Sequence, residues 1–157
     1  MQEGLDTFDR RILALLQEDA TRSSAEIAEK VGLSQSPCWR RMQRLKDEGY
    51  ITRQVAVLDR RKLGLNAQVF AMVKLTMHGR QNLEEFANRV RSYPQVMECH
   101  ILMGNFDFLL RIVTEDIDAY QGFFFDTLSR LPGIQEVNSV ISLSEIKSTT
   151  ALPLKGL

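Results

Sequence analysis

The hydrophobic pattern of this 157-residue chain changes its period near Gly64. Before this glycine, apolar side chains such as Phe8, Ile12 and Leu15 recur three or four positions apart, which is the spacing of one helix face. Beyond it, in residues 69–77, apolar residues follow one another as in a strand that is buried on both faces. The chain therefore predicts a helical N-terminal unit followed by a unit built on a β-sheet, and its length suffices for two small domains.

The composition excludes several classes of protein. With 44% hydrophobic residues, 25% charged residues and a formal net charge of zero, the chain is globular and has no overall attraction for nucleic acid. Cys38 and Cys99 have neither disulfide nor metal-ligand spacing, which favours a reducing, cytoplasmic setting. The N-terminus lacks a signal-peptide pattern, and no apolar run approaches the roughly 20 residues that span a bilayer. We expect no membrane partner and no metal.

Two helices are predicted at the start of the chain. The first begins near Asp6, and both Asp6 and Asp9 suit its first turn because the helix dipole favours negative charge there. Ser23 and Glu26 have the spacing of a capping box, which marks the start of the second helix. Gly32 ends this helix, because glycine readily adopts positive φ at a helix C-terminus. The short turn that follows is typical of a helix-turn-helix unit.

A third helix is predicted over residues 34–48, with a serine as its cap and Pro37 in its first turn, where a missing amide proton is harmless. At 100° per residue, Cys38, Met42 and Leu45 share one apolar side. Hydroxyl, amide and guanidinium groups on the polar side and its flanks can bond base edges or phosphates. The candidate DNA-binding residues are Ser34, Gln35, Ser36, Trp39, Arg40, Arg41, Gln43 and Arg44.

An arginine-rich helix also has a structural interpretation, because charged side chains commonly cover a solvated face. A lone tryptophan such as Trp39 commonly packs against a neighbouring helix. The preceding helix, turn and cap favour DNA binding. A strand over residues 50–58 is expected to complete a winged helix-turn-helix domain of residues 1–58. A basic linker, residues 59–66, leads to a second domain, residues 67–157.

The second domain alternates strands and helices. Runs of apolar and β-branched residues predict strands at 69–77, 96–103, 108–114 and 137–146. Helical spacing predicts helices at 83–90 and 116–128, and the pairs Gly104-Asn105 and Pro132-Gly133 supply turns. The order is βαββαβ, so the fold class is α+β, with a C-terminal ferredoxin-like, or ACT-like, domain.

In this arrangement both helices cover one face of the sheet and leave the other, which carries apolar side chains, uncovered. A second copy of the chain is the simplest cover. The consecutive residues Phe123, Phe124 and Phe125 point about 100° apart on a helix, so at most two can face the domain's own core. The third is expected to serve a further subunit contact.

The segment 103–107 has two interpretations. Gly104-Asn105 is typical of a hairpin, and an aspartate near a turn, such as Asp107, often accepts backbone hydrogen bonds. Alternatively, backbone groups freed at the turn can meet a small charged ligand, with Asp107 available to a cationic group. The residues alone leave both interpretations open.

The sequence argues against an enzyme. His78 and His100 have no accompanying nucleophile or metal-ligand arrangement, and there is no glycine loop of the phosphate-binding type. Both histidines are predicted to be strand-surface or packing residues. No cofactor is expected.

Together these segments resemble the Lrp/AsnC, or feast/famine, family of transcriptional regulators over nearly the whole chain. The resemblance is carried by five motifs: Leu5-Asp6-x-x-Asp9-Arg10-x-Ile12-Leu13, Gly32-Leu33-Ser34-x-Ser36-Pro37-Cys38-Trp39-Arg40-Arg41, Gly104-Asn105-Phe106-Asp107-Phe108, Pro132-Gly133-Ile134 and Ile146-Lys147-x-Thr149-Thr150-x-Leu152-Pro153-Leu154.

The resemblance implies dimers formed through the second domain, often assembled into octamers, and an amino acid or related metabolite bound between dimers. It assigns this ligand to the turn formed by Met103, Gly104, Asn105, Phe106 and Asp107. Thr149 and Thr150 either approach the same region or lie in an exposed tail. Asn105 departs from the acidic residue common after this glycine, which removes one negative charge.

The sequence thus predicts a cytoplasmic, nucleoid-associated regulator that binds specific double-stranded DNA as a homo-oligomer and responds to an amino-acid effector. The alternative left open is a nucleoid-type architectural protein, which wraps DNA with little sequence preference and without an effector. The regulator would bind a specific site much more tightly than random DNA, whereas the architectural protein would bind both with similar affinity.

Overall fold

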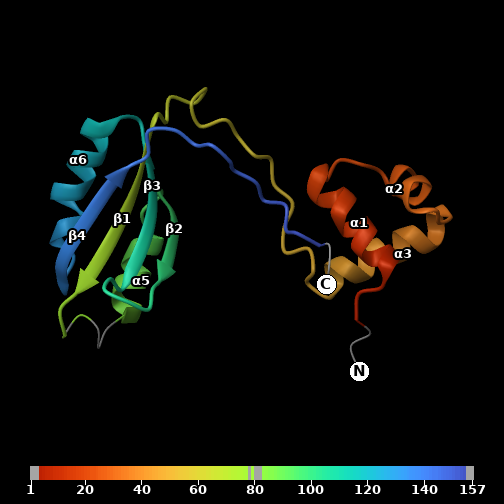
Figure 1. Cartoon of the computed structure of the whole chain (residues 1–157), viewed down its shortest axis with the longest axis horizontal. Coiled ribbons are helices and arrows are strands. Elements are labelled where there is room, and N and C mark those ends of the chain that lie inside the picture. Colours follow the sequence, from red (N-terminus) through yellow and green to blue (C-terminus); the bar gives the residue numbers. More distant parts are fainter. Residues whose placement is uncertain (1–3, 78, 80–82, 155–157) are drawn as a thin grey trace. The chain divides into compact units, whose positions relative to one another are not determined.

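The computed structural model of the protein describes residues 4–77, 79 and 83–154. Contacts group the chain into two compact units (Figure 1). The first, which we call the helical unit, comprises Met1–Val57 and Lys147–Leu157, and the second, which we call the sheet unit, comprises Leu58–Ile146. The sequence-based division assigned residues 147–157 to the second domain, whereas the contacts group them with the helical unit. His78, expected on a strand surface or in packing, lies outside the described residues.

The helical unit contains α1 (Thr7–Glu18), α2 (Ser24–Val31) and α3 (Gln35–Asp47). The expected capping box between Ser23 and Glu26 is confirmed, and Asp6 and Asp9 form a second one at the start of α1. At Gly32 the φ angle is 78°, and the amide donates to carbonyl groups of α2. The chain therefore turns sharply from α2 into α3.

The apolar sides of the three helices meet in one core. Its buried side chains are Ile12, Leu16, Ile27, Ala28, Val31, Cys38, Met42 and Leu45. Arg11 of α1 donates to the carbonyl groups of Lys30 and Val31 at 2.8 and 3.2 Å, and so occupies acceptors that α2 leaves open at its C-terminus. The core contains Cys38, Met42 and Leu45 and therefore fixes which side of α3 remains in solvent.

The prediction of a strand at residues 50–58 is wrong, because none of the described residues in this stretch is in a strand. A run rich in β-branched residues favours an extended chain, but a strand also needs a neighbouring segment to bond its amides. Among the described residues, none bonds the backbone amides of residues 52–58, and Val55, Val57 and Leu58 are exposed.

The C-terminal segment is joined to α1 by an amide pair. Gln17 Nε2 donates to the carbonyl of Leu152 at 2.9 Å, and the amide of Leu152 donates to Gln17 Oε1 at 2.8 Å. The two bonds resemble those between paired strands, with a side chain in place of one strand. The helical unit is therefore built from segments that lie on both sides of the sheet unit in the sequence.

The sheet unit contains β1 (Ala67–Leu75), α5 (Leu83–Arg91), β2 (Val96–Ile101), β3 (Phe108–Thr114), α6 (Ile117–Asp126), the short 3-10 helix η1 (Leu128–Arg130) and β4 (Ile134–Ile141). The strands are antiparallel in the order β2-β3-β1-β4, which confirms the βαββαβ, ferredoxin-like arrangement. β4 ends earlier than expected: its paired residues stop at Ile141, opposite Val69, and beyond them the amide of Ser142 makes one more bond, to the carbonyl of Gln68 at 2.9 Å. None of the described helices is long and apolar enough to cross a membrane.

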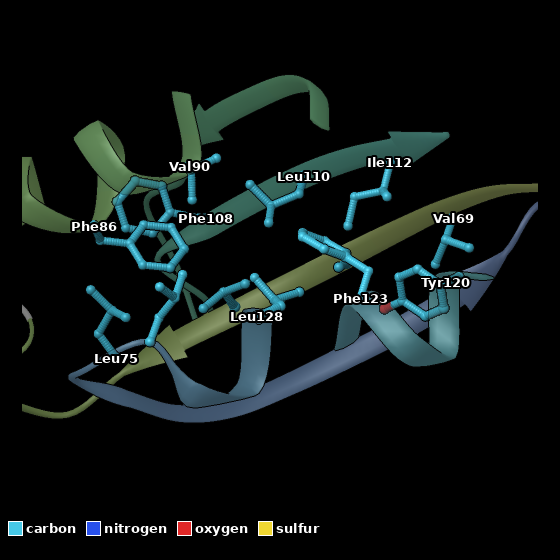
Figure 2. Packing of buried hydrophobic residues seen from close by; sticks show 13 residues of the cluster. Val69, Leu75, Phe86, Val90, Phe108, Leu110, Ile112, Tyr120, Phe123 and Leu128 are labelled. Carbon is cyan, nitrogen blue, oxygen red and sulfur yellow. The ribbon is translucent and has the colours of Figure 1, made fainter. Parts of the chain in front are cut away.

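Both helices cover the same face of the sheet. Alternate residues of β1 and β3 point to this face and pack against side chains of α5 and α6, with Phe86 and Phe123 among the largest (Figure 2). The three consecutive phenylalanines divide as expected. Phe123 is buried, Phe124 packs at the edge of the core, and Phe125 is 56% exposed.

The other face of the sheet, which we call the open face, has no described helix over it. The strand register places four apolar side chains next to one another on this face: Phe70, Met72, Leu109 and Val140. On the same face, Arg111 of β3 lies opposite Phe70 and pairs with Glu98 of β2 at 2.7 Å. The open face thus combines an apolar strip with a charged pair directly beside it.

Candidate nucleic-acid interface and effector turn

Helix α3 buries one side and presents the other to solvent. Cys38, Met42 and Leu45 are buried, which leaves Ser36 and Arg40 on the opposite side, as the 100° spacing predicts. Arg40 is exposed, and no described residue bonds its guanidinium group. The first turns of α3 therefore offer uncommitted polar groups.

The eight residues expected to contact DNA fall into two groups. Six keep polar groups or a ring accessible: Ser34, Gln35, Ser36, Trp39 and Arg40 are exposed, and Gln43 is partly buried. Ser34 occupies the expected N-cap position, but its hydroxyl makes no capping bond with the described residues, so it is available to a ligand. Trp39 is 52% exposed and is therefore not a core residue.

The other two, Arg41 and Arg44, point from α3 to the start of α1. Arg41 Nη1 donates to Asp6 Oδ2 at 2.6 Å and to Asp9 Oδ1 at 2.8 Å, and Arg44 Nη2 donates to Asp9 Oδ2 at 2.5 Å. The side chain of Asp9 is 1% exposed, whereas those of Arg41 and Arg44 are 30% and 31% exposed. We call these four side chains the ion cluster. It fixes α3 against α1 with charge-assisted hydrogen bonds.

The pKa values reflect the balance of charge in the ion cluster. The backbone amide of Asp9 and the guanidinium of Arg41 lower the pKa of Asp6. Hydrogen bonds to Asp9 and then to Asp6 raise the pKa of Arg41, and a hydrogen bond to Asp9 raises that of Arg44. Two carboxylates thus formally balance two guanidinium groups, and the cluster adds no net positive charge to α3.

The sequence pattern places Asp6 and Asp9 at the dipole of α1 and by itself does not reveal this pairing. The available signal was the spacing of the charges. Asp6 and Asp9 are three apart, as are Arg41 and Arg44, and residues three apart share a helix face. Two same-face pairs of opposite charge indicate an ion cluster once the two helices are known to touch.

The turn between β2 and β3 is the second candidate site, and it holds all five residues expected to bind a ligand. Met103, Gly104 and Asn105 are exposed, while Phe106 and Asp107 are partly buried. Gly104 has a φ of 156°, a backbone conformation that residues with a Cβ rarely adopt. The turn therefore presents backbone groups to solvent at one end of the sheet.

Asp107 fastens this turn to β1. Its carboxylate accepts a hydrogen bond from the amide of Leu75 at 2.7 Å, and its amide donates to the carbonyl of Val73 at 2.9 Å. Regular pairing of β1 with β3 ends at Val73 and Phe108, so the carboxylate extends that pairing by one bond. The structural interpretation of Asp107 is confirmed, and contact with a ligand stays a prediction.

The remaining candidates make no further site. His100 lies on the open face with its Nε2 3.4 Å from Glu98 Oε2, and both side chains are exposed. Thr149 and Thr150 are exposed in the segment grouped with the helical unit. Within the described residues, no three His, Cys, Asp or Glu side chains converge in a way that holds a metal ion.

Two family models match the chain. Residues 5–52 match a winged helix-turn-helix DNA-binding domain, and residues 68–152 match the Lrp/AsnC ligand binding domain. The first match contains all eight candidate DNA-binding residues. The second contains the turn of residues 103–107.

Similar proteins span nearly the whole chain. The DNA-binding transcriptional activator DecR of Escherichia coli is 36% identical over 96% of this chain and 99% of its own length. The glutamate uptake regulatory protein of Zymomonas mobilis is 39% identical over 98% of this chain and 93% of its own. A transcriptional regulator of Neisseria meningitidis, solved in complex with L-methionine, has a TM-score of 0.93 at 38% identity, covering 97% of this chain and 98% of that chain.

Proposed function

The chain belongs to the Lrp/AsnC family of transcriptional regulators, and we propose that it binds specific DNA through α3 and alters this binding when an amino acid occupies the sheet unit. The observation that carries the proposal is the exposed polar side of α3, which is anchored through its apolar side and follows the sharp turn at Gly32. A helix held in this way can lie in the major groove with its N-terminal residues at base edges.

The accessible residues of α3 divide by position along the helix. Arg40 can bond a guanine edge or a phosphate, and Gln43 can bond an adenine edge. Residues 34–36, at the helix start, reach base edges or phosphate oxygens through their hydroxyl and amide groups. Trp39 flanks this side and is assigned to the sugar-phosphate backbone.

Arg40→Ala tests the assignment of α3 in a gel-shift titration on a site selected by the unsubstituted protein. We expect affinity to fall by about tenfold or more, because a bidentate base contact is worth about 1–3 kcal/mol. Arg91→Ala removes the same charge from α5 in the other unit and should leave binding unchanged. Equal affinities for the unsubstituted and Arg40→Ala proteins would place DNA elsewhere.

The same titration with random DNA of equal length separates a regulator from an architectural protein. A sequence-specific regulator binds its selected site about a thousandfold or more tighter than random DNA. Equal affinity for both would favour the architectural alternative.

An amino acid is the effector class that we assign to the sheet unit. Support comes from two relatives, a regulator named for glutamate uptake and one solved with L-methionine. In this chain the turn of residues 103–107 offers backbone groups that suit the carboxylate and ammonium of an amino acid, with Asp107 holding the turn in place. If none of the common amino acids changes affinity for the selected site, the effector part of the proposal fails and the DNA part stands.

A second copy of the chain is the partner that we assign to the open face. Phe70, Met72, Leu109 and Val140 form an apolar strip there, and a symmetric dimer would bury two such strips against each other. A two-fold dimer also suits a roughly palindromic DNA site. Phe125, exposed on α6, is assigned to contacts that join dimers into octamers. Such an assembly would act on the nucleoid in the cytoplasm.

A further inference from the structure

The three arginines in the first ten residues of α3 are not equally available to DNA. Arg40 is exposed without a partner among the described residues, whereas Arg41 and Arg44 are paired with carboxylates of α1. The two carboxylates differ in their surroundings, because Asp9 is 1% exposed and Asp6 is 46% exposed. Asp9 is a buried part of the helix pair, and Asp6 is open to solvent and ions.

Asp6 lies in a concavity of about 680 Å³ beside the first turns of α3. The residues that line it include Asp6, Pro37, Arg40, Arg41 and Arg44. Because Arg40 also belongs to the polar side of α3, DNA docked on that side would bring its phosphates along this lining. At this place the carboxylate of Asp6, 2.6 Å from Arg41, competes with phosphate for the same guanidinium group.

We propose that Asp6 limits the DNA affinity of the protein: together with Asp9, which accepts from the same guanidinium group at 2.8 Å, it neutralises Arg41 and Arg44, and its charge withholds one phosphate contact per protomer. This inference rests on the proposed binding of DNA by α3. A phosphate contact strengthens binding to any sequence, so Asp6 sets the overall strength of binding and not the preference among sequences. In a chain with zero formal net charge, binding depends on such local charges.

Asp6→Asn tests this role with little change in local structure. Asparagine is as good an N-cap as aspartate, so the bond that Asp6 Oδ1 accepts from the amide of Asp9 at 2.8 Å is retained. The substitution removes the charge that faces Arg41. Asp19→Asn is the matched control, because it removes the same charge from the C-cap at the opposite end of α1.

Affinity is measured by fluorescence anisotropy with two labelled duplexes, a random sequence and a site selected by the unsubstituted protein, over a range of salt concentrations. For Asp6→Asn we expect about three- to tenfold tighter binding to both duplexes near 0.1 M salt. The slope of log affinity against log salt should steepen by about 0.9 per protomer. Asp19→Asn should change affinity by less than about twofold.

Substitutions of Arg41 provide an independent arm. Arg41→Gln alone should leave the salt slope unchanged, because the arginine is already committed to carboxylates. The double variant Asp6→Asn/Arg41→Gln should lose the whole gain of Asp6→Asn. A shallower slope for Arg41→Gln alone would mean that Arg41 already holds a phosphate, and this result would overturn the inference even if Asp6→Asn failed to fold.

Other outcomes also decide the matter. Unchanged or weaker binding by folded Asp6→Asn, or an equal gain from Asp19→Asn, would overturn the role of Asp6. If the unsubstituted protein bound the selected and the random duplex with equal affinity, the proposed function would be contradicted instead. In that case, the affinity for the random duplex still tests whether Asp6 limits binding.

Discussion

Replacing Asp9 by alanine is expected to destabilise the helical unit by about 2–4 kcal/mol. Its carboxylate accepts hydrogen bonds from Arg41 at 2.8 Å, from Arg44 at 2.5 Å and from the backbone of Asp6 at 3.2 Å. A hydrogen bond to a charged group is worth about 1.5–3 kcal/mol. Because the side chains of Arg41 and Arg44 are 30% and 31% exposed, water replaces part of each lost bond, and the lower end of that range applies to each.

Trp39 supplies the assay. It is the only tryptophan of the chain and lies on α3, so its fluorescence reports unfolding of the helical unit separately from the sheet unit. In urea, with a slope of about 1 kcal/mol per molar for a unit of this size, the unfolding midpoint should fall by about 2 M or more. Asp19→Ala, at the exposed C-cap of α1, is the control and should shift the unfolding midpoint much less than Asp9→Ala.

A midpoint shift smaller than about 0.5 M for Asp9→Ala would refute this reasoning. It would mean that removing the buried carboxylate from water costs as much free energy as its three hydrogen bonds return. Circular dichroism of the same samples shows whether the helices are intact before urea is added.

Three further outcomes are expected. Asp107→Ala should abolish the rise in melting temperature that a bound amino acid gives in a thermal-shift panel while sparing DNA binding, and a rise that survives would contradict the assigned site. Phe70→Glu should yield folded monomers in analytical ultracentrifugation, whereas an unchanged mass would place the dimer contact elsewhere. The pKa values of Asp6 and Glu98 lie below their ordinary 3.8 and 4.5, chiefly because the Asp9 amide and Arg111 bond the ionised forms. The two ionised carboxylates therefore contribute their full stabilisation at pH values above these ordinary pKa values and lose it as pH falls through their lowered pKa values. Melting temperature should be steady from about pH 5 to 7 and drop below about pH 4. A melting temperature that stays constant below pH 4 would mean that these pairs contribute nothing to stability.

The helix limits were predictable because they depend on residues a few positions apart. Ser23 and Glu26 bond each other, and Gly32 ends α2 through its own backbone conformation. The order of elements in the sheet unit was predictable for the same reason, since turn residues such as Gly104 act locally. These signals need no knowledge of which segments meet in space.

The pairing of elements was not predictable in this way. Helical spacing places Arg41 and Arg44 beside the polar side of α3, but it does not reveal that the start of α1 packs there. The bond from Leu75 to Asp107 likewise joins residues 32 positions apart. Residues 50–58 show the converse case: their composition strongly favours a strand, but no described segment pairs with them as a neighbouring strand.

The amide pair between Gln17 and Leu152 has a consequence for how the protein is made. The two residues are 135 positions apart, and the whole sheet unit is translated between them. At about 5–20 residues per second, α1 waits roughly 7–27 seconds on the ribosome for its partner. The pair between Gln17 and Leu152 can therefore form only after every strand of the sheet unit has been synthesised.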